Sequence, residues 1–298
     1  MTKMIKVTFP SNDVILVGNL YTPDNLTQKA PALPILGPMT FVKEQAPTEY
    51  ARRFAERGFI ALAFDPRYHG ESEGEPRRFE SPMAKAEDVQ AAIDYLQSRS
   101  DVEAEHILAM AVCQGSSAMI RAVADDRRVK AFSTVAGHYR DHEADVEWMG
   151  TEAALTERRN RGEQAKRHYE ETGEVEYVPA VDPQRLDVGM PGEFVWDWYS
   201  PWAERGIWEN RYALMSDADL LTYESLSAVS RIQTPYLMIH SDNSFLPNAA
   251  RRHFDAVPTA DKKLVWEGST GHFQYYEDPA VLDKTTDQMT DWFRSHLR

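Results

Sequence analysis

Cys113 is the residue whose type and position carry the clearest chemical signal. It is the single cysteine of the chain, and it follows the apolar run Ile107–Val112 directly. A helix is expected over Ser116–Ala124, so the thiol stands on a tight turn between a buried strand and a helix, the context of the G-x-S-x-G nucleophile motif. Ala111 and Gly115 supply the small residues that such a turn requires. We therefore predict that Cys113 is a nucleophile rather than an inert buried thiol.

The environment expected for this thiol favours its ionised form. A helix N-terminus carries partial positive charge, and a nearby histidine would lower the pKa of the thiol further. Ser116 and Ser117 are alternative nucleophiles, but they fall one turn into the expected helix, where capping or packing is the better interpretation.

A histidine is needed as general base, and the chain has nine. His272 is favoured because it lies in a loop with Gly268 and Gly271, between the last expected strand and the closing helix. His69, in a turn, and His240, inside a buried strand, are the alternatives. We predict that His272 accepts the thiol proton.

An acid should orient that histidine and stabilise its protonated form. Asp242 follows the apolar run Pro235–Ser241 and precedes His272, which gives the order nucleophile, acid, histidine of one known triad layout. A turn-stabilising role is the alternative for an aspartate in this position. Ser244 lies nearer to the point at which the acid often falls, but we predict Asp242 as the acid.

Alternating strands and helices must position these residues. Short apolar runs bounded by turn residues predict strands over Val14–Tyr21, Ala32–Gly37, Phe59–Phe64, Ile107–Val112, Val129–Val135, Pro235–Ser241 and Lys263–Glu267. Helices are expected over Glu49–Arg57, Pro82–Gln97, Ser116–Ala124, Asn248–Ala256 and Val281–Leu297. This alternation predicts an α/β fold with a mostly parallel central sheet flanked by helices.

The alternation stops between residues 138 and 230. Glu152–Glu171 is strongly charged and helical in character, and five of the seven tryptophans fall in this segment. We predict residues 1–137 and 231–298 as the core and residues 138–230 as an inserted helical cap. The aromatic residues of the cap either hold it together or line a pocket for an apolar or aromatic substrate. Trp198, Tyr199 and Trp202, with Met39 of the core, are the predicted substrate-binding residues.

Composition limits the partners of the protein. Asp and Glu outnumber Lys and Arg by 47 to 33, a formal charge of −14 that repels nucleic acid and anionic membranes. No apolar run approaches the ~20 residues of a membrane span, and the N-terminal residues lack a signal-peptide core, so a cytoplasmic protein is expected. No metal-ligand spacing is present, and we predict a small-molecule substrate with no metal and no organic cofactor. The oligomeric state stays open, with a homodimer among the options.

In their order and spacing, these segments resemble the α/β-hydrolases, in the branch of dienelactone hydrolases and polyketide-processing hydrolases. The resemblance covers essentially the whole chain and rests on Gly37–Gln45, Gly58–Asp65, Tyr68–Gly74, the Cys113 turn and the loops of Asp242 and His272. Cysteine stands where many members have serine. The resemblance implies an oxyanion hole of two backbone N–H groups, one of them that of Gln114. The other is assigned to Thr40, or else Met39, because Pro38 has no N–H.

Three functions follow from this resemblance. The favoured one is a hydrolase with a Cys-His-Asp triad, which acts on an ester-like, lactone or thioester acyl group of a small apolar or aromatic metabolite through a covalent acyl-enzyme. The cap would then serve as a lid. The same site could instead perform acyl transfer, cyclisation or carbon–carbon cleavage on a polyketide-like metabolite. A ligand-binding homologue without catalysis is the third function.

Overall fold

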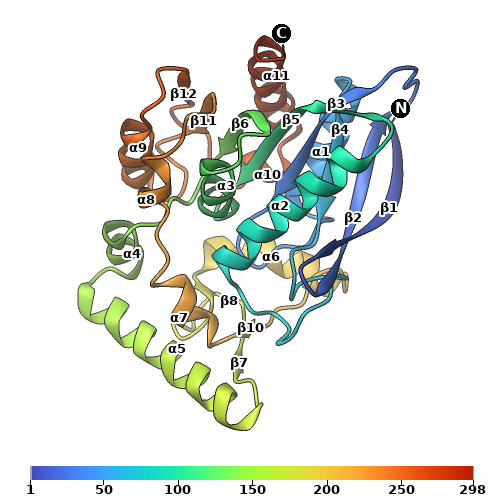
Figure 1. Ribbon diagram of the computed structural model, residues 1–298. Helices are drawn as coiled ribbons and strands as arrows, with labels where there is room; N and C mark the ends of the chain where they lie inside the picture. The colour runs from blue at the N-terminus through green and yellow to red at the C-terminus, as the bar shows by residue number, and fades with distance from the viewer. Residues whose placement is uncertain (1, 298) are drawn as a thin grey trace.

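Eight strands form one sheet at the centre of the protein, in the computed structural model that describes residues 2–297. The strands are β1 (Thr2–Ser11), β2 (Val14–Pro23), β3 (Ala30–Leu36), β4 (Ile60–Phe64), β5 (Val102–Val112), β6 (Val129–Val135), β11 (Tyr236–His240) and β12 (Lys262–Trp266). Their order is β1-β2-β4-β3-β5-β6-β11-β12, which runs from right to left in Figure 1. β1 and β2 are antiparallel, β2 is antiparallel to β4, and every other pair is parallel. The predicted mostly parallel sheet is confirmed.

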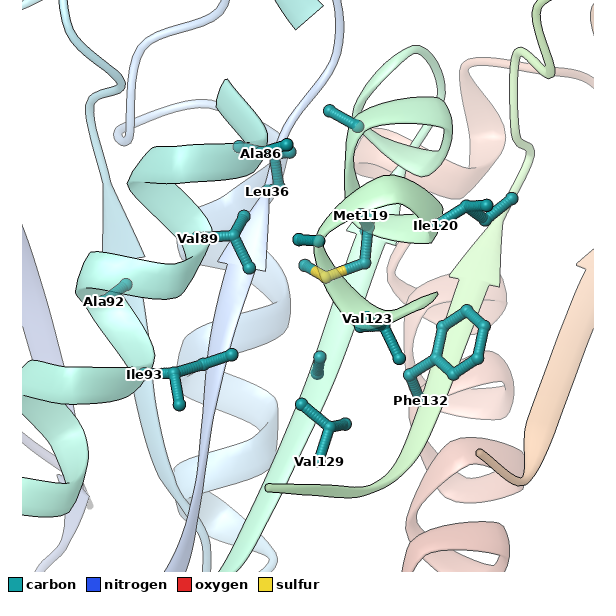
Figure 2. Packing of buried hydrophobic residues seen from close by; sticks show 14 of the residues in the cluster. Leu36, Ala86, Val89, Ala92, Ile93, Met119, Ile120, Val123, Val129 and Phe132 are labelled. Carbon is teal, nitrogen blue, oxygen red and sulfur yellow. The ribbon is translucent and has the colours of Figure 1, made fainter. Parts of the chain in front are cut away.

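Helices cover both faces of this sheet. One group consists of α1 (Ala46–Glu56), α10 (Gln274–Glu277) and α11 (Pro279–Ser295), which contact one another. The other consists of α2 (Pro82–Ser98), α3 (Gly115–Ala124), α8 (Leu226–Val229) and α9 (Pro247–Ala256). Figure 2 shows Val89 and Ile93 of α2 and Met119 of α3 in the buried cluster between these helices and the strands. Burying this apolar surface is the main stabilising contribution to the core.

The chain leaves the sheet between β6 and β11. This segment contains α4 (His142–Met149), α5 (Glu152–Thr172), α6 (Glu193–Glu204), α7 (Ser216–Leu220) and α8. It also contains four two-residue strands, β7 (Tyr177–Val178) paired with β10 (Tyr212–Ala213) and β8 (Val181–Asp182) paired with β9 (Met190–Pro191). Figure 1 shows most of the segment below the sheet, with α5 along the outside. Among residues 2–297, no helix combines the length and the apolar character that crossing a bilayer requires.

Two differences from the expected elements have a physical cause. The sequence analysis assigned no strand to β1, whose side chains are mostly exposed because it is the edge strand of the sheet. An edge strand lacks the continuous apolar run by which buried strands are recognised. β5 begins at Val102, five residues before the expected start at Ile107, and residues 103–106, which follow the buried Val102, are incompletely buried. The strand end that matters for the site, Val112, lies where it was expected.

Candidate active site

Cys113 occupies the turn between β5 and α3. Its backbone has φ +52°, in the left-handed region that costs a non-glycine residue about 1–3 kcal/mol. Its N–H donates to the carbonyl of Val135 in β6 at 3.1 Å, which ties the turn to the sheet. Gly115 makes the turn sterically feasible, because a Cβ at this position would lie 2.4 Å from the carbonyl oxygen of Gly37. The predicted strand–turn–helix context of the thiol is therefore present.

Two backbone N–H groups reach the thiol. They belong to Gln114, at the start of α3, and to Met39, in the loop after β3. The N–H of Thr40 is not available, because it donates to Oε2 of Glu80 at 2.9 Å. The structure therefore places Met39, the second choice of the sequence analysis, beside the thiol in place of Thr40.

Two residues of the segment between β6 and β11 hold this loop in place. The hydroxyl of Tyr199 in α6 donates to the carbonyl of Met39 at 2.8 Å. The indole of Trp208 donates to the carbonyl of Thr40 at 2.7 Å. Both bonds are buried, and together they orient the two peptide groups that follow Met39.

A buried ion pair also holds this loop in place. Glu80 is 0% exposed and Lys85 is 2% exposed, and their side chains are hydrogen-bonded to each other. Lys85 also donates to the carbonyl of Pro38 at 3.4 Å, while Glu80 accepts from Thr40. The backbone N–H of Glu80 donates to Ser216 of α7 at 2.9 Å. The strands and helices of the sheet and the segment between β6 and β11 thus meet at the same loop.

His272 lies close to the thiol, but a tyrosine hydroxyl stands between them. Nε2 of His272 is 2.8 Å from the hydroxyl of Tyr276, and that hydroxyl is hydrogen-bonded to the Cys113 thiol. Nδ1 of His272 is 2.8 Å from Oγ of Ser244 and 3.3 Å from the backbone nitrogen of Phe245. Cys113, Tyr276, His272 and Ser244 therefore form one connected chain of hydrogen bonds.

Asp242 does not take part in this chain. Its side chain is 61% exposed and accepts from Trp266 at 2.9 Å and from Arg251 at 3.2 Å. No carboxylate among residues 2–297 is bonded to His272, whose Nδ1 faces Ser244 instead. The assignment of Asp242 as the orienting acid is corrected accordingly. An ionised carboxylate loses less hydration at the surface beside Arg251 than it would beside the buried imidazole.

The resting site carries no charge on its two central groups. Burial raises the pKa of the Cys113 thiol, although the hydrogen bond from Tyr276 and those from the two backbone N–H groups act in the opposite direction. Burial lowers the pKa of His272 to about 3, with a smaller contribution from His240. Neutral thiol and neutral imidazole are therefore the forms expected at pH 7. The expectation of a lowered thiol pKa is not met, because desolvation outweighs the hydrogen bonds that reach the sulphur.

A cavity of about 220 Å³ opens beside the thiol. It is lined by Met39, Cys113, His138, Trp148, Met190, Pro191, Phe194, Val195, Tyr199, Phe245, His272, Phe273 and Tyr276. The segment between β6 and β11 and the rest of the chain both contribute residues, and the wall contains no carboxylate, lysine or arginine. The arrangement suits an uncharged, apolar or aromatic group next to a sulphur atom.

Of the predicted substrate-binding residues, Met39 and Tyr199 line this cavity, and the two tryptophans do not. Trp198 is buried behind the wall and stacks on Phe273 at 5.3 Å. Trp202 packs against the guanidinium of Arg205 at 4.0 Å. The two tryptophans are corrected to packing positions, because their faces of α6 do not point at the thiol.

Several lining residues were missed by the sequence analysis, above all Tyr276. Tyr276 follows His272 by four residues, the spacing that places two side chains on one side of a helical turn. That spacing was the available signal. The alternative histidine His240 is buried in β11 with both ring nitrogens near backbone carbonyls, and His69 lies against the carbonyl of Arg67.

Comparisons with known proteins agree with this fold. No protein-family model matches the sequence. The uncharacterized protein PA2218 of Pseudomonas aeruginosa is 29% identical over 310 residues, which cover 98% of this chain and 80% of the relative. Its crystal structure superimposes with a TM-score of 0.85 at 28% identity and covers 99% of this chain and 94% of that one.

Two fungal relatives match over shorter stretches. The polyketide transferase grgF of a Penicillium species is 30% identical over 142 residues, 45% of this chain and 47% of the relative. The thiohydrolase aneE of Aspergillus aculeatus is 32% identical over 120 residues, 40% of this chain and 37% of the relative. This chain thus spans less than half the length of either fungal relative.

The solved structures establish the fold. The structure of GrgF, described as an α/β hydrolase, has a TM-score of 0.83 at 24% identity and covers 99% of each chain. A dienelactone hydrolase from Anabaena variabilis has a TM-score of 0.61 at 15% identity and covers 100% of this chain and 99% of the other. The α/β-hydrolase fold that the sequence predicted is therefore confirmed.

Proposed function

We propose that this α/β-hydrolase-fold chain is an enzyme in which the thiolate of Cys113 attacks an activated acyl group and forms a covalent acyl-enzyme. The observation that carries the proposal is the strained turn at Cys113, whose thiol is reached by the N–H groups of Gln114 and Met39 at the wall of an apolar cavity. Two N–H groups directed at the attacking sulphur are also placed to receive the carbonyl oxygen of a bound acyl group.

In the proposed reaction, His272 takes up the thiol proton as the sulphur attacks the carbonyl carbon. The carbonyl oxygen becomes an oxyanion, which the N–H groups of Gln114 and Met39 stabilise; one such donor contributes about 10²–10³ in rate. The leaving group takes the proton back from His272. Water then attacks the acyl-enzyme with His272 as general base, and the acid and the free thiol of Cys113 are released.

A thioester, lactone or activated ester fits the site better than a stable amide does. A thiolate is a good nucleophile and a good leaving group, so attack is productive only where the substrate's own leaving group departs at least as readily. The cavity of about 220 Å³ lies below the ~300–1,000 Å³ that drug-sized ligands require, which favours a small acyl group. One relative carries the name thiohydrolase, in line with a thioester substrate.

Acyl transfer or cyclisation is the second candidate function. The wall facing the thiol is mostly aromatic and aliphatic and carries few groups that could hold a water molecule for attack on the acyl-enzyme. An amine, an alcohol or a carbon nucleophile could then intercept the intermediate. The name of one relative, polyketide transferase, is in line with this alternative.

The test uses N-acetylcysteamine thioesters of benzoate, cinnamate and hexanoate, together with a phenyl ester and a lactone. Intact-protein mass spectrometry should detect an acyl adduct on the wild-type chain and none on Cys113→Ala. Cys113→Ser keeps the shape of the turn and should acylate far more slowly. Adding an amine or an alcohol separates transfer from hydrolysis by the product formed. Turnover of these substrates by Cys113→Ala at the wild-type rate would refute the proposal, and a complete lack of turnover with saturable binding would indicate a ligand-binding protein.

A further inference from the structure

Tyr276 stands at the centre of the site without a role in the reaction just described. Its hydroxyl is 2.8 Å from Nε2 of His272 and hydrogen-bonded to the thiol of Cys113. Its ring is buried and held edge-on by Trp198 at 5.0 Å and by Phe273 at 5.1 Å. A side chain clamped in this way keeps its hydroxyl in one position between nucleophile and base.

We propose that Tyr276 is a catalytic residue that relays the proton between Cys113 and His272. The inference rests on the proposed role of Cys113 as nucleophile. A phenolic hydroxyl can accept one hydrogen bond while it donates another, which is what a group between a thiol and an imidazole must do. No direct hydrogen bond joins the sulphur to His272, whose Nε2 is bonded to Tyr276 instead.

The relay balances without any further reactant. As the sulphur bonds to the carbonyl carbon, the S–H bond breaks and its proton moves to the tyrosine oxygen. The phenolic proton moves at the same time to Nε2 of His272, and the carbonyl π electrons pass to the oxyanion. His272 begins as the neutral tautomer with its proton on Nδ1, which donates to Ser244 2.8 Å away and leaves Nε2 free to accept. Tyr276 ends neutral, and His272 ends as an imidazolium. Departure of the leaving group runs the same two transfers backwards.

The surroundings of the relay support concerted transfer. Because a raised thiol pKa and a lowered imidazole pKa make a separated thiolate–imidazolium pair unstable at rest, the proton should move only as the sulphur attacks. The other titratable groups that face Tyr276 are Tyr199 of α6 and Tyr50 of α1. Burial raises the pKa of both, so both are uncharged at neutral pH.

The decisive variant is Tyr276→Phe, which removes the hydroxyl and keeps the ring. Tyr275→Phe, in the same short helix α10, is the matched control because the Tyr275 side chain does not line the cavity. Single-turnover acylation by a cinnamoyl thioester should fall by about 10²–10⁴ in Tyr276→Phe, the range of general acid–base catalysis, with little change in substrate affinity. Tyr275→Phe should acylate at the wild-type rate.

A solvent isotope measurement separates a relay from a packing role. In mixtures of H₂O and D₂O, the wild-type acylation rate should depend non-linearly on the fraction of D₂O, because two protons move together. In Tyr276→Phe the dependence should become linear. Should Tyr276→Phe fold poorly, 3-fluorotyrosine at position 276 lowers the phenol pKa without altering the packing and should shift the pH profile of acylation.

Two results would overturn the relay and leave the proposed function standing. The first is acylation of Cys113 in Tyr276→Phe at the wild-type rate or faster, which would mean that the hydroxyl restrains the thiol and does not assist its reaction. The second is the same dependence of the acylation rate on D₂O content in Tyr276→Phe as in the wild type. Absence of any adduct on wild-type Cys113 would instead overturn the proposed function itself.

Discussion

The buried pair of Glu80 and Lys85 offers a test of how the loop beside Cys113 is held. Glu80→Gln removes one charge, keeps the side-chain shape and replaces one carboxylate oxygen by an NH2 group, so the Lys85 ammonium, 2% exposed, loses its charged partner. Stranding one member of a buried pair costs about 3–5 kcal/mol of unfolding free energy. Urea unfolding at pH 7 should therefore show Glu80→Gln destabilised by that amount. Glu56→Gln, which breaks the half-exposed pair with Arg52, should stay within about 1 kcal/mol of wild type.

The double variant Glu80→Gln/Lys85→Met makes the test specific. Once the ammonium is gone, no uncompensated charge remains, so the double variant should be more stable than Glu80→Gln alone. Its acylation rate should nevertheless stay low, because the Pro38 carbonyl has lost the Lys85 ammonium and the Thr40 N–H has lost its charged acceptor, and both contacts orient the loop that carries the Met39 N–H. The loss of one oxyanion donor corresponds to about 10²–10³ in rate. A double variant no more stable than Glu80→Gln, or wild-type acylation in Glu80→Gln, would refute the reasoning.

Three further predictions concern residues of the site. Asp242→Asn should acylate at the wild-type rate, whereas Ser244→Ala should be slower, as judged by single-turnover mass spectrometry; the opposite ranking would restore Asp242 as the orienting acid. Gly115→Ala should unfold at a clearly lower urea concentration than the wild type, because its Cβ would lie 2.4 Å from a backbone oxygen. Gly271→Ala should unfold near the wild-type urea concentration, because its Cβ would meet only the flexible end of a side chain at 3.3 Å. His272, with a pKa lowered from 6.5 to about 3, binds a proton only when the chain unfolds, so it removes stability as the pH falls below 6.5, about 2 kcal/mol at pH 5. Measured by urea unfolding, the free energy of unfolding of His272→Gln should fall less between pH 7 and pH 5 than that of the wild type, by that amount. An equal fall in both proteins would contradict a buried neutral imidazole.

Local sequence patterns predicted most of the fold. Buried parallel strands are continuous apolar runs, so Ile60–Phe64 and Val129–Val135 were recognised almost residue by residue. The turn at Cys113 was equally readable, because a buried strand, one nucleophile and a helix follow each other within a few residues. These features depend only on residues that are close together in the sequence, so they can be recognised without the tertiary structure.

Contacts between distant segments decided the rest. The N–H of Thr40 is bonded to a carboxylate 40 residues away and so does not reach the thiol. Ser244, and not Asp242, lies beside Nδ1 of His272, which is 28 residues farther along the chain. Which N–H stays free, and which side chain reaches Nδ1, depends on how the loops pack once the sheet has formed. The sequence by itself determined the position of the thiol and the elements on either side of it. Only the tertiary structure decided which groups surround that thiol and that burial leaves it neutral, because the thiol loses its hydration only when distant segments of the chain pack around it.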